Sequence, residues 1–277
     1  MFYLILGILA SSMVSIVMRL TKTRVKNETS LLAVNYVTCI LIAGTYMGFD
    51  RAVTNEPGFV TAMALGLGTG ILYLAGFLLL QWNVGKNGVV LSSTFMKLGL
   101  LVPIAFSLLF FGETPTALQA AGFVLAVAAV LMMNSGEKTV SRARWALVLL
   151  LLSCGTGDAM SKVYEYLGRA EMSDQFLFYT FVSAFVLCLL LVIRKREKPG
   201  AKELFWGAML GLPNYFSARF ILAALQDLPA VIVYPTFSVA SMVVLTLTGV
   251  CFFKEKLRQR EWLAIGVILV SLVLLNV

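Results

Sequence analysis

The chain has 277 residues, of which 60% are hydrophobic and 13% are charged, and its formal net charge is +8. The mean hydropathy of the chain is +0.90, and its share of charged residues is about half that of an average soluble domain. These values exclude a water-soluble fold, and we expect a protein of the lipid bilayer. Basic residues gather in the cytoplasmic loops of membrane proteins, so the positive charge does not require nucleic acid, and no nucleic-acid partner is expected.

Apolar runs of membrane-spanning length recur along the whole chain. About 20 apolar residues cross a bilayer, and we therefore predict ten transmembrane helices, joined by loops too short to hold a separate soluble domain. The first run has no basic segment before it, so we expect a spanning helix there and not a cleaved signal peptide. The predicted helices cover residues 2–19, 30–49, 59–82, 88–111, 115–133, 145–163, 174–193, 203–226, 229–253 and 260–277.

The charges of the loops predict how these helices are oriented. The first, third, fifth, seventh and ninth loops together carry a net charge of +11, whereas the four loops between them carry −4. Because Lys and Arg are retained on the cytoplasmic side, we expect the odd-numbered loops in the cytoplasm and both termini outside. The membrane is expected to be the cytoplasmic (inner) membrane of a bacterium.

An offset of 142 residues aligns the two halves of the sequence. GVVLSSTFMKLGLLVPIAFSLLFFGE (88–113) then lies over AVIVYPTFSVASMVVLTLTGVCFFKE (230–255), with Glu113 on Glu255. Each half, residues 1–135 and 143–277, holds five predicted helices, an odd number, so the halves cross the membrane in opposite senses. Such inverted repeats are typical of secondary transporters, whose substrate site lies near the midplane between them. The predicted fold class is an all-α integral membrane protein with ten transmembrane helices, arranged as two inverted-topology five-helix repeats around a central cavity.

The duplicated segments LLFFGETPTALQAAGFVL (108–125) and GVCFFKEKLRQREWLAIGVIL (249–269) carry a resemblance to a known family. In each, an apolar run ends in a glutamate and a glycine-containing helix follows. Together with the ten short-looped helices, this resembles the EamA-type members of the drug/metabolite transporter superfamily. The resemblance implies that helices 1 to 4 and 6 to 9 surround a central cavity and that helices 5 and 10 are peripheral. Well-known members have cytoplasmic termini, whereas the loop charges here predict the opposite.

Once the charges of the loops and the adjoining helix ends are counted, three charged side chains remain, and they lie inside predicted helices: Lys97, Asp158 and Arg219. A charge at the centre of a membrane helix costs about 2.5–3.5 kcal/mol and is a functional hypothesis by default. Lys97 lies near the midplane, and we predict that it binds an anionic group or titrates during transport. The alternative is a buried ion pair, most plausibly with Asp158.

Arg219 and Asp158 each allow a functional and a structural interpretation. Arg219, nearer the predicted outer end, could hold a carboxylate or phosphate in bidentate fashion, or it could anchor its helix at the outer interface. Asp158, flanked by Gly155 and Gly157, could bind a cation, take up a coupling proton or neutralise Lys97 or Arg219. With two cations and one anion, the cavity is expected to be net positive, which favours an anionic or zwitterionic substrate.

Further polar side chains within the predicted helices are candidates for substrate binding. A tyrosine can stack on a ligand and also hydrogen-bond to it, while ordinary hydrogen bonds between helices are the alternative. These candidates are Tyr73 and its repeat mate Tyr215, together with Asn214, Tyr234 and Asn35.

We therefore predict a secondary active transporter that moves a small polar metabolite, anionic or zwitterionic, by alternating access. A proton or a counter-substrate is expected to drive it, because no nucleotide-binding motif is present. The alternative is proton-coupled efflux of amphipathic organic cations or drugs, bound by Asp158 and the aromatic residues. No enzymatic activity, cofactor or metal is expected, since the sequence has no histidine and no carboxylate cluster. The expected partners are the small-molecule substrate and the lipid bilayer, and the oligomeric state is left open.

Overall fold

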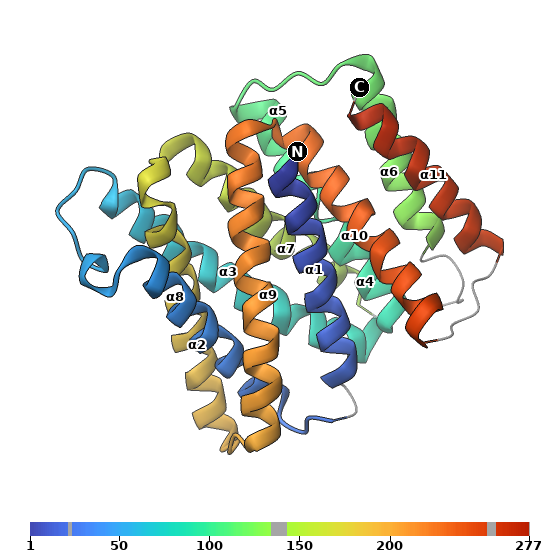
Figure 1. Cartoon of the computed structure of the whole chain (residues 1–277). Coiled ribbons are helices and arrows are strands. Elements are labelled where there is room, and N and C mark those ends of the chain that lie inside the picture. Colours follow the sequence, from blue (N-terminus) through green and yellow to red (C-terminus); the bar gives the residue numbers. More distant parts are fainter. Residues whose placement is uncertain (22–23, 134–142, 254–258, 277) are drawn as a thin grey trace.

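The computed structural model describes residues 1–21, 24–133, 143–253 and 259–276, and within these ranges the chain is helical and contains no β-strand (Figure 1). The ends of the two predicted halves at residues 135 and 277, and Glu255 of the repeat, lie outside the described residues. The helices in chain order are α1 (Phe2–Thr21), α2 (Glu28–Met47), η1 (Phe49–Arg51), α3 (Phe59–Asn87), α4 (Val89–Leu98), α5 (Leu101–Phe110), α6 (Ala117–Met133), α7 (Arg144–Leu167), η2 (Ala170–Met172), α8 (Ser173–Lys195), α9 (Ala201–Asp227), α10 (Ala230–Phe253) and α11 (Gln259–Leu275).

The described helices group into ten segments that correspond to the ten predicted helices. Eight helical segments are long and apolar enough to cross a membrane, and one of them consists of α4 and α5 together. The other two spans, α6 and α11, have 17 residues each, at the lower limit for crossing a bilayer. Large apolar side chains such as Leu41, Ile71 and Leu190 are exposed on the outward surfaces of the spans, as expected where lipid replaces water. The chain is an all-α, multi-pass integral membrane protein.

Both termini lie on one side of the molecule, as an even number of spans requires (Figure 1). We call the side where α1 begins and α11 ends the terminus face, and the opposite side, where α1 ends and α2 begins, the basic face. A single residue, Gly88, separates α3 from α4 on the basic face and has φ +83°. Because glycine adopts this left-handed conformation without a Cβ clash, the chain turns back into the membrane at once.

The fourth span corrects the sequence prediction of one continuous helix over residues 88–111. At the junction of α4 and α5 the N–H groups of Gly99 and Val102 donate to the carbonyls of Met96 and Gly99, three residues back, at 3.1 and 2.9 Å. This is the shorter step of a 3₁₀ turn. Pro103 has no N–H to donate to the carbonyl of Gly99, so the α-helical bond that would bridge the junction cannot form. The span is therefore two half-helices that meet in the middle of the membrane.

Glycines allow the two halves of the molecule to pack closely. A Cβ added at Gly70 of α3 would lie 2.1 Å from the carbonyl oxygen of Thr180 in α8, and one added at Gly211 of α9 would lie 2.7 Å from the carbonyl oxygen of Asn35 in α2. Any larger residue would push these helices apart. Because α3 matches α9 and α8 matches α2 in the repeat, the same close contact occurs twice, related by the pseudo-twofold axis of an inverted repeat.

The remaining contacts between helices follow the same symmetry. α1 packs on α9 and α10, and their repeat mates α7, α3 and the α4–α5 span pack in the same way. α6 and α11, the fifth helices of the two halves, lie side by side at one edge of the molecule (Figure 1). The inverted five-helix repeats and the peripheral position of the two fifth helices agree with the predicted fold class.

Candidate functional site

A cavity of about 400 Å³ lies between the two halves of the molecule. Its wall is formed by α1, α2, α3 and α4 from the first half and by α7, α9 and α10 from the second. Apolar side chains make up more of the wall than polar ones. A mostly apolar pocket with a few convergent polar groups is the usual form of a small-molecule site. Six of the eight predicted site residues line this cavity: Lys97, Asp158, Tyr73, Asn214, Tyr234 and Asn35.

Lys97 lies in the last turn of α4, next to the break in the fourth span. The C-terminal end of a helix carries partial negative charge, which stabilises a nearby cation by about 0.3–1 kcal/mol. A lysine at the centre of a membrane helix costs about 2.5–3.5 kcal/mol, so the helix end alone does not offset that cost. The side chain also faces the cavity and is only partly buried, and contact with water or a ligand there supplies the remainder.

Asp158 projects from the middle of α7 into the same cavity and remains exposed there. The two glycines beside it bring its neighbours close. A Cβ added at Gly155 would lie 2.3 Å from the carbonyl oxygen of Gly99, and one added at Gly157 would lie 3.3 Å from the ring of Tyr73. Because these glycines have no side chain, the α4–α5 junction and the Tyr73 ring pack close to Asp158, and the space beside the glycines is filled.

Lys97 and Asp158 do not form the ion pair that the sequence allowed. The two charges are near enough to influence each other, but the ion pairs among the described residues join other side chains. Within the part of the chain that the structure describes, neither the ammonium nor the carboxylate has a hydrogen-bond or ion-pair partner. Both charges are therefore available to a ligand.

Two tyrosines accompany Asp158. The hydroxyl of Tyr234 in α10 donates to the backbone carbonyl of Asp158 at 2.8 Å, and Tyr73 in α3 lies within electrostatic reach of the carboxylate. These contacts hold α10 and α3 against α7 at the level of Asp158. An organic cation bound by the carboxylate can pack against these aromatic rings.

Polar groups also lie elsewhere on the cavity wall. The amide of Asn214 in α9 donates to the side-chain oxygen of Asn35 in α2 at 3.2 Å, so this pair joins the two halves. The hydroxyl of Ser153 in α7 is buried and has no hydrogen-bond partner within the described residues. An unsatisfied buried hydroxyl in a cavity wall is a position where a ligand or water can accept or donate a hydrogen bond.

Arg219 and Tyr215, the other two predicted site residues, lie outside the cavity lining. The Arg219 guanidinium pairs with Asp174 at the start of α8, donates to the hydroxyl of Tyr215 at 2.6 Å and lies over the ring of Tyr46, 4.2 Å from its centroid. The expectation of a net positive cavity is therefore wrong. Among the residues that the structure describes, the charged side chains that line the cavity are one lysine and one aspartate.

A cluster of buried charges ties the two halves together on the terminus face. Glu113, between α5 and α6, pairs with Lys162 of α7 at 2.9 Å and accepts hydrogen bonds from the N–H groups of Ala230 and Val231 at 3.1 and 3.2 Å. It thus caps the N-terminus of α10, where the helix dipole favours an anion. Lys162 also pairs with Glu165 at 2.6 Å. Lys162 lies within α7 and is buried.

The environment of Glu113 shifts its acidity. Burial raises the pKa of Glu113, but the hydrogen bond and the charge of Lys162, together with the N–H groups of Ala230 and Val231, outweigh this effect and hold the pKa below the usual value of a glutamate. The cluster lies directly beyond Ser161, which lines the cavity. It is therefore placed at the terminus-face end of the cavity.

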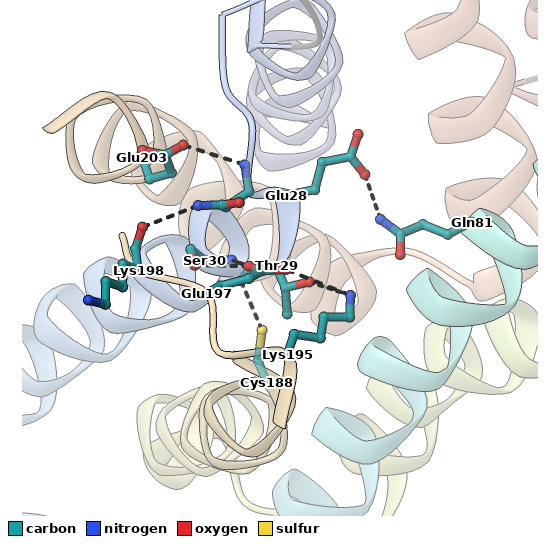
Figure 2. Close-up of polar contacts among 10 residues, drawn as sticks. Glu28, Thr29, Ser30, Gln81, Cys188, Lys195, Glu197, Lys198 and Glu203 are labelled. Atoms are coloured by element: carbon teal, nitrogen blue, oxygen red, sulfur yellow. Dashed lines mark hydrogen bonds and ion pairs between the residues drawn. The ribbon is translucent and has the colours of Figure 1, made fainter. Parts of the chain in front are cut away.

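On the basic face, an acidic side chain of the α8–α9 connection and another in the first turn of α9 hold the start of α2 (Figure 2). The Glu197 carboxylate accepts hydrogen bonds from the N–H and the hydroxyl of Ser30 at 3.0 and 2.9 Å, while Glu203 accepts from the backbone of Lys26 and Asn27. The N-terminus of α2 is thus capped by the opposite half, as the N-terminus of α10 is on the terminus face. Each face of the molecule has a polar contact that joins the halves.

Several cavity residues were missed by the sequence analysis, although a signal was present. Cys154 and Ser161 line the cavity with Asp158 and follow the i, i+4, i+7 spacing of one helix face. Phe77 stands four residues after Tyr73 in α3 and lines the cavity too. These residues would have been found if the neighbours on the same helix face had been added to each polar candidate within the membrane.

Together, the ten spans, the inverted repeats and the polar cavity between them define a multi-pass membrane protein of the transporter class. The sequence profile of the EamA-like transporter family matches residues 143–277. A protein of Haemophilus influenzae described as uncharacterized is 25% identical over 276 residues, which cover 95% of this chain and 93% of that protein.

Two relatives with a described function are similar to a shorter part of the chain. The probable 4-amino-4-deoxy-L-arabinose-phosphoundecaprenol flippase subunit ArnE of Hamiltonella defensa is 37% identical over 84 residues, covering 29% of this chain and 72% of the relative. The same subunit of Proteus mirabilis is 37% identical over 79 residues, covering 27% and 66%. The chain belongs to the drug/metabolite transporter superfamily and is a membrane transporter of that type. A crystal structure with 15% sequence identity superposes with a TM-score of 0.77 over 99% of this chain and 94% of the other, which shows the shared fold.

Proposed function

We propose that the protein is a secondary active transporter that moves a small polar solute, anionic or zwitterionic, across the membrane by alternating access. The observation that carries this proposal is a pair of charges, Lys97 and Asp158, on the wall of a cavity between the two halves, for which the described residues supply no hydrogen-bond or ion-pair partner. An intramembrane charge without a protein partner marks a substrate or ion pathway. The proposed rocking units are residues 1–135 and 143–277, and the protein is not an enzyme.

Orientation and coupling belong to the same proposal. We propose that the basic face lies in the cytoplasm and both termini outside, in a bacterial inner membrane, and the positive charge of the odd-numbered loops supports this orientation. A proton or a counter-substrate drives the cycle. The contacts of Glu113 on the terminus face and of Glu197 and Glu203 on the basic face join the two halves, and rocking of the halves would break one set while the other is kept.

The second candidate is efflux of amphipathic organic cations, which Asp158 and the nearby tyrosines favour. Resistance to such cations on overexpression, lost in Asp158→Asn, would support efflux over the leading proposal. The ArnE relatives are named for a lipid-linked molecule that contains an amino group and a phosphate. A headgroup of that kind carries both charges and fits the zwitterionic form of the leading proposal.

Uptake by reconstituted protein tests the proposal. Solutes that stabilise the purified protein against heat are selected from a metabolite panel, and their uptake into proteoliposomes is measured for the wild type and for Lys97→Ala. We expect the wild type to take up the solute and Lys97→Ala to lose at least about tenfold in rate, the value of one charge-assisted hydrogen bond. Lys202→Ala, which removes an exposed lysine at the start of α9, is the matched control and should transport normally. Unchanged uptake by Lys97→Ala, with a normal unfolding temperature, would remove Lys97 from the substrate site.

A further inference from the structure

Lys97 and Asp158 lie at different levels of two neighbouring helices. α4 and α7 both run from the basic face toward the terminus face, and they touch where Gly99 meets Gly155. Lys97 stands two residues before this contact and Asp158 three residues after it. At a rise of about 1.5 Å per residue, the two backbone positions are offset by roughly 7–8 Å along the helix axes. The side chains of both helices tilt toward their N-termini, which preserves the offset.

The glycine contact also brings the two helices as close together as their backbones allow. A Cβ at Gly155 would lie 2.3 Å from the Gly99 carbonyl and 2.6 Å from the Val102 side chain, so the backbones already touch. Leaving an ammonium and a carboxylate unpaired inside a membrane is costly. A fold that holds opposite charges apart in one cavity offers each of them to an opposite charge from outside the chain.

A small zwitterion can bridge two opposite charges that line one cavity. Charge-assisted hydrogen bonds are about 2.7–2.9 Å long, and an ammonium and an acidic group on neighbouring carbons are roughly 3 Å apart. Two such bonds in series with the zwitterion span roughly 8–9 Å, a length that the flexible lysine side chain can adjust to across the cavity. A solute with a single charge would satisfy one side chain and leave the other without a partner.

The two ends of the cavity also differ in character. Asp158 lies near Tyr73 and Tyr234, whose rings suit an ammonium group. The wall beyond the charges is apolar and includes Phe77, Leu80 and Phe237. The cavity of about 400 Å³ leaves room for an apolar substituent beside the charged groups.

We infer that the cavity binds a small zwitterion that carries an apolar substituent, with the ammonium group on Asp158 and the carboxylate or phosphate on Lys97. This inference rests on the proposed function, since it names the substrate class of the same site. It narrows the anionic-or-zwitterionic choice, because Arg219 lies outside the cavity and the lining charges balance.

A series of three probes of nearly equal shape tests the inference. L-leucine carries both charges, leucinamide only the cation and 4-methylpentanoate only the anion. Binding to the purified full-length protein is measured at neutral pH by thermal shift and by calorimetry. We expect L-leucine to bind about ten- to hundredfold more tightly than either singly charged analogue, the range for losing one hydrogen bond to a charged group.

Charge variants identify which side chain binds which end. Asp158→Asn should weaken leucine and leucinamide about ten- to hundredfold and spare 4-methylpentanoate, and Lys97→Met should do the reverse. Asp227→Asn and Lys202→Met, which remove exposed charges outside the cavity, are the matched controls. If one charge variant fails to fold, the other variant and the wild-type series still decide the matter.

A free solute and a lipid headgroup can present the same charges, and the assay separates these sources. O-phosphoethanolamine is added in solution, and phosphatidylethanolamine is supplied in nanodiscs against a phosphatidylglycerol control. Binding of the soluble zwitterions indicates a free solute, whereas stabilisation by the phosphatidylethanolamine nanodiscs alone indicates a lipid headgroup, and both support the inference. Equal binding of the three leucine probes, preference for a single charge, or no response to any zwitterion would overturn it. Measured transport of a singly charged solute would overturn the inference and leave the proposed function standing, while zwitterion binding without any transport would do the opposite.

Discussion

Lys97 and Arg219 illustrate two ways in which a membrane protein accommodates a basic side chain. Arg219 is surrounded by Asp174, Tyr215 and Tyr46, which neutralise its charge and use its planar face. Lys97 lies at the end of α4 and faces the cavity, and no side chain of the described residues pairs with it. The first arrangement is complete without a ligand, whereas the second is not.

The difference predicts opposite behaviour on mutation. Arg219→Met should lower the free energy of unfolding by about 1–3 kcal/mol, the usual value of a hydrogen-bonded charged group, because Asp174 loses its partner. Substrate affinity should stay within a few-fold of the wild type, because Arg219 does not line the cavity. Thermal unfolding in detergent with and without the bound solute measures both quantities. Loss of binding without loss of stability would instead place Arg219 in contact with the substrate during the cycle.

The sequence could identify these residues but could not assign their partners. A charged residue in an apolar run is visible in the sequence, and six of the eight candidates do line the cavity. Whether Arg219 reaches Asp174 or a ligand depends on how α8 and α9 pack, which no local pattern encodes. The error in the predicted cavity charge follows directly from that missing contact.

At the level of helices, the break between α4 and α5 is the feature with most consequence. It gives Lys97 a helix end in mid-membrane and lets the junction touch α7 at Gly155. The sequence contained its cause, Gly99 followed four residues later by Pro103. The same residue type does not break every helix, since Pro213 and Pro235 lie inside the continuous helices α9 and α10. Hydropathy alone therefore could not separate a broken span from an intact one.

Glu113 allows a pH test of the contact between the halves. Because its folded-state pKa is lowered, the ionised carboxylate stabilises the fold above its unfolded-state pKa, and this contribution disappears as the pH falls through the folded-state pKa. Glu113→Gln should therefore cost about 1–3 kcal/mol at neutral pH and make stability less sensitive to acidification. Unfolding temperatures measured between neutral and acidic pH report this difference.

The control for that measurement is another carboxylate on the terminus face. Glu56→Gln removes an exposed charge in the connection between α2 and α3 and should leave both the stability and its pH dependence unchanged. If Glu113→Gln behaved like Glu56→Gln, the buried cluster would not hold the halves together.

At the level of the whole molecule, the inverted repeat determines which features could be predicted. Ten spans and two halves follow from periodic hydropathy and from the 142-residue offset, which are properties of the sequence alone. The packing has a matching symmetry, since the contact of Gly70 with α8 has its counterpart in the contact of Gly211 with α2. Lys97 departs from the symmetry, because its repeat mate Val239 is fully buried apolar core. The charge of Lys97 occurs in one half only, and it makes the cavity between two otherwise similar halves a candidate transport site.

Counterflow is the measurement that tests this account most directly. Proteoliposomes are loaded with unlabelled solute, diluted into trace labelled solute and sampled over time without any ion gradient. Alternating access through one cavity predicts that labelled solute accumulates transiently above its equilibrium level in the wild type and fails to do so in Lys97→Ala. Equilibration without this overshoot, or an overshoot that persists unchanged in Lys97→Ala, would contradict transport through the site formed by Lys97 and Asp158.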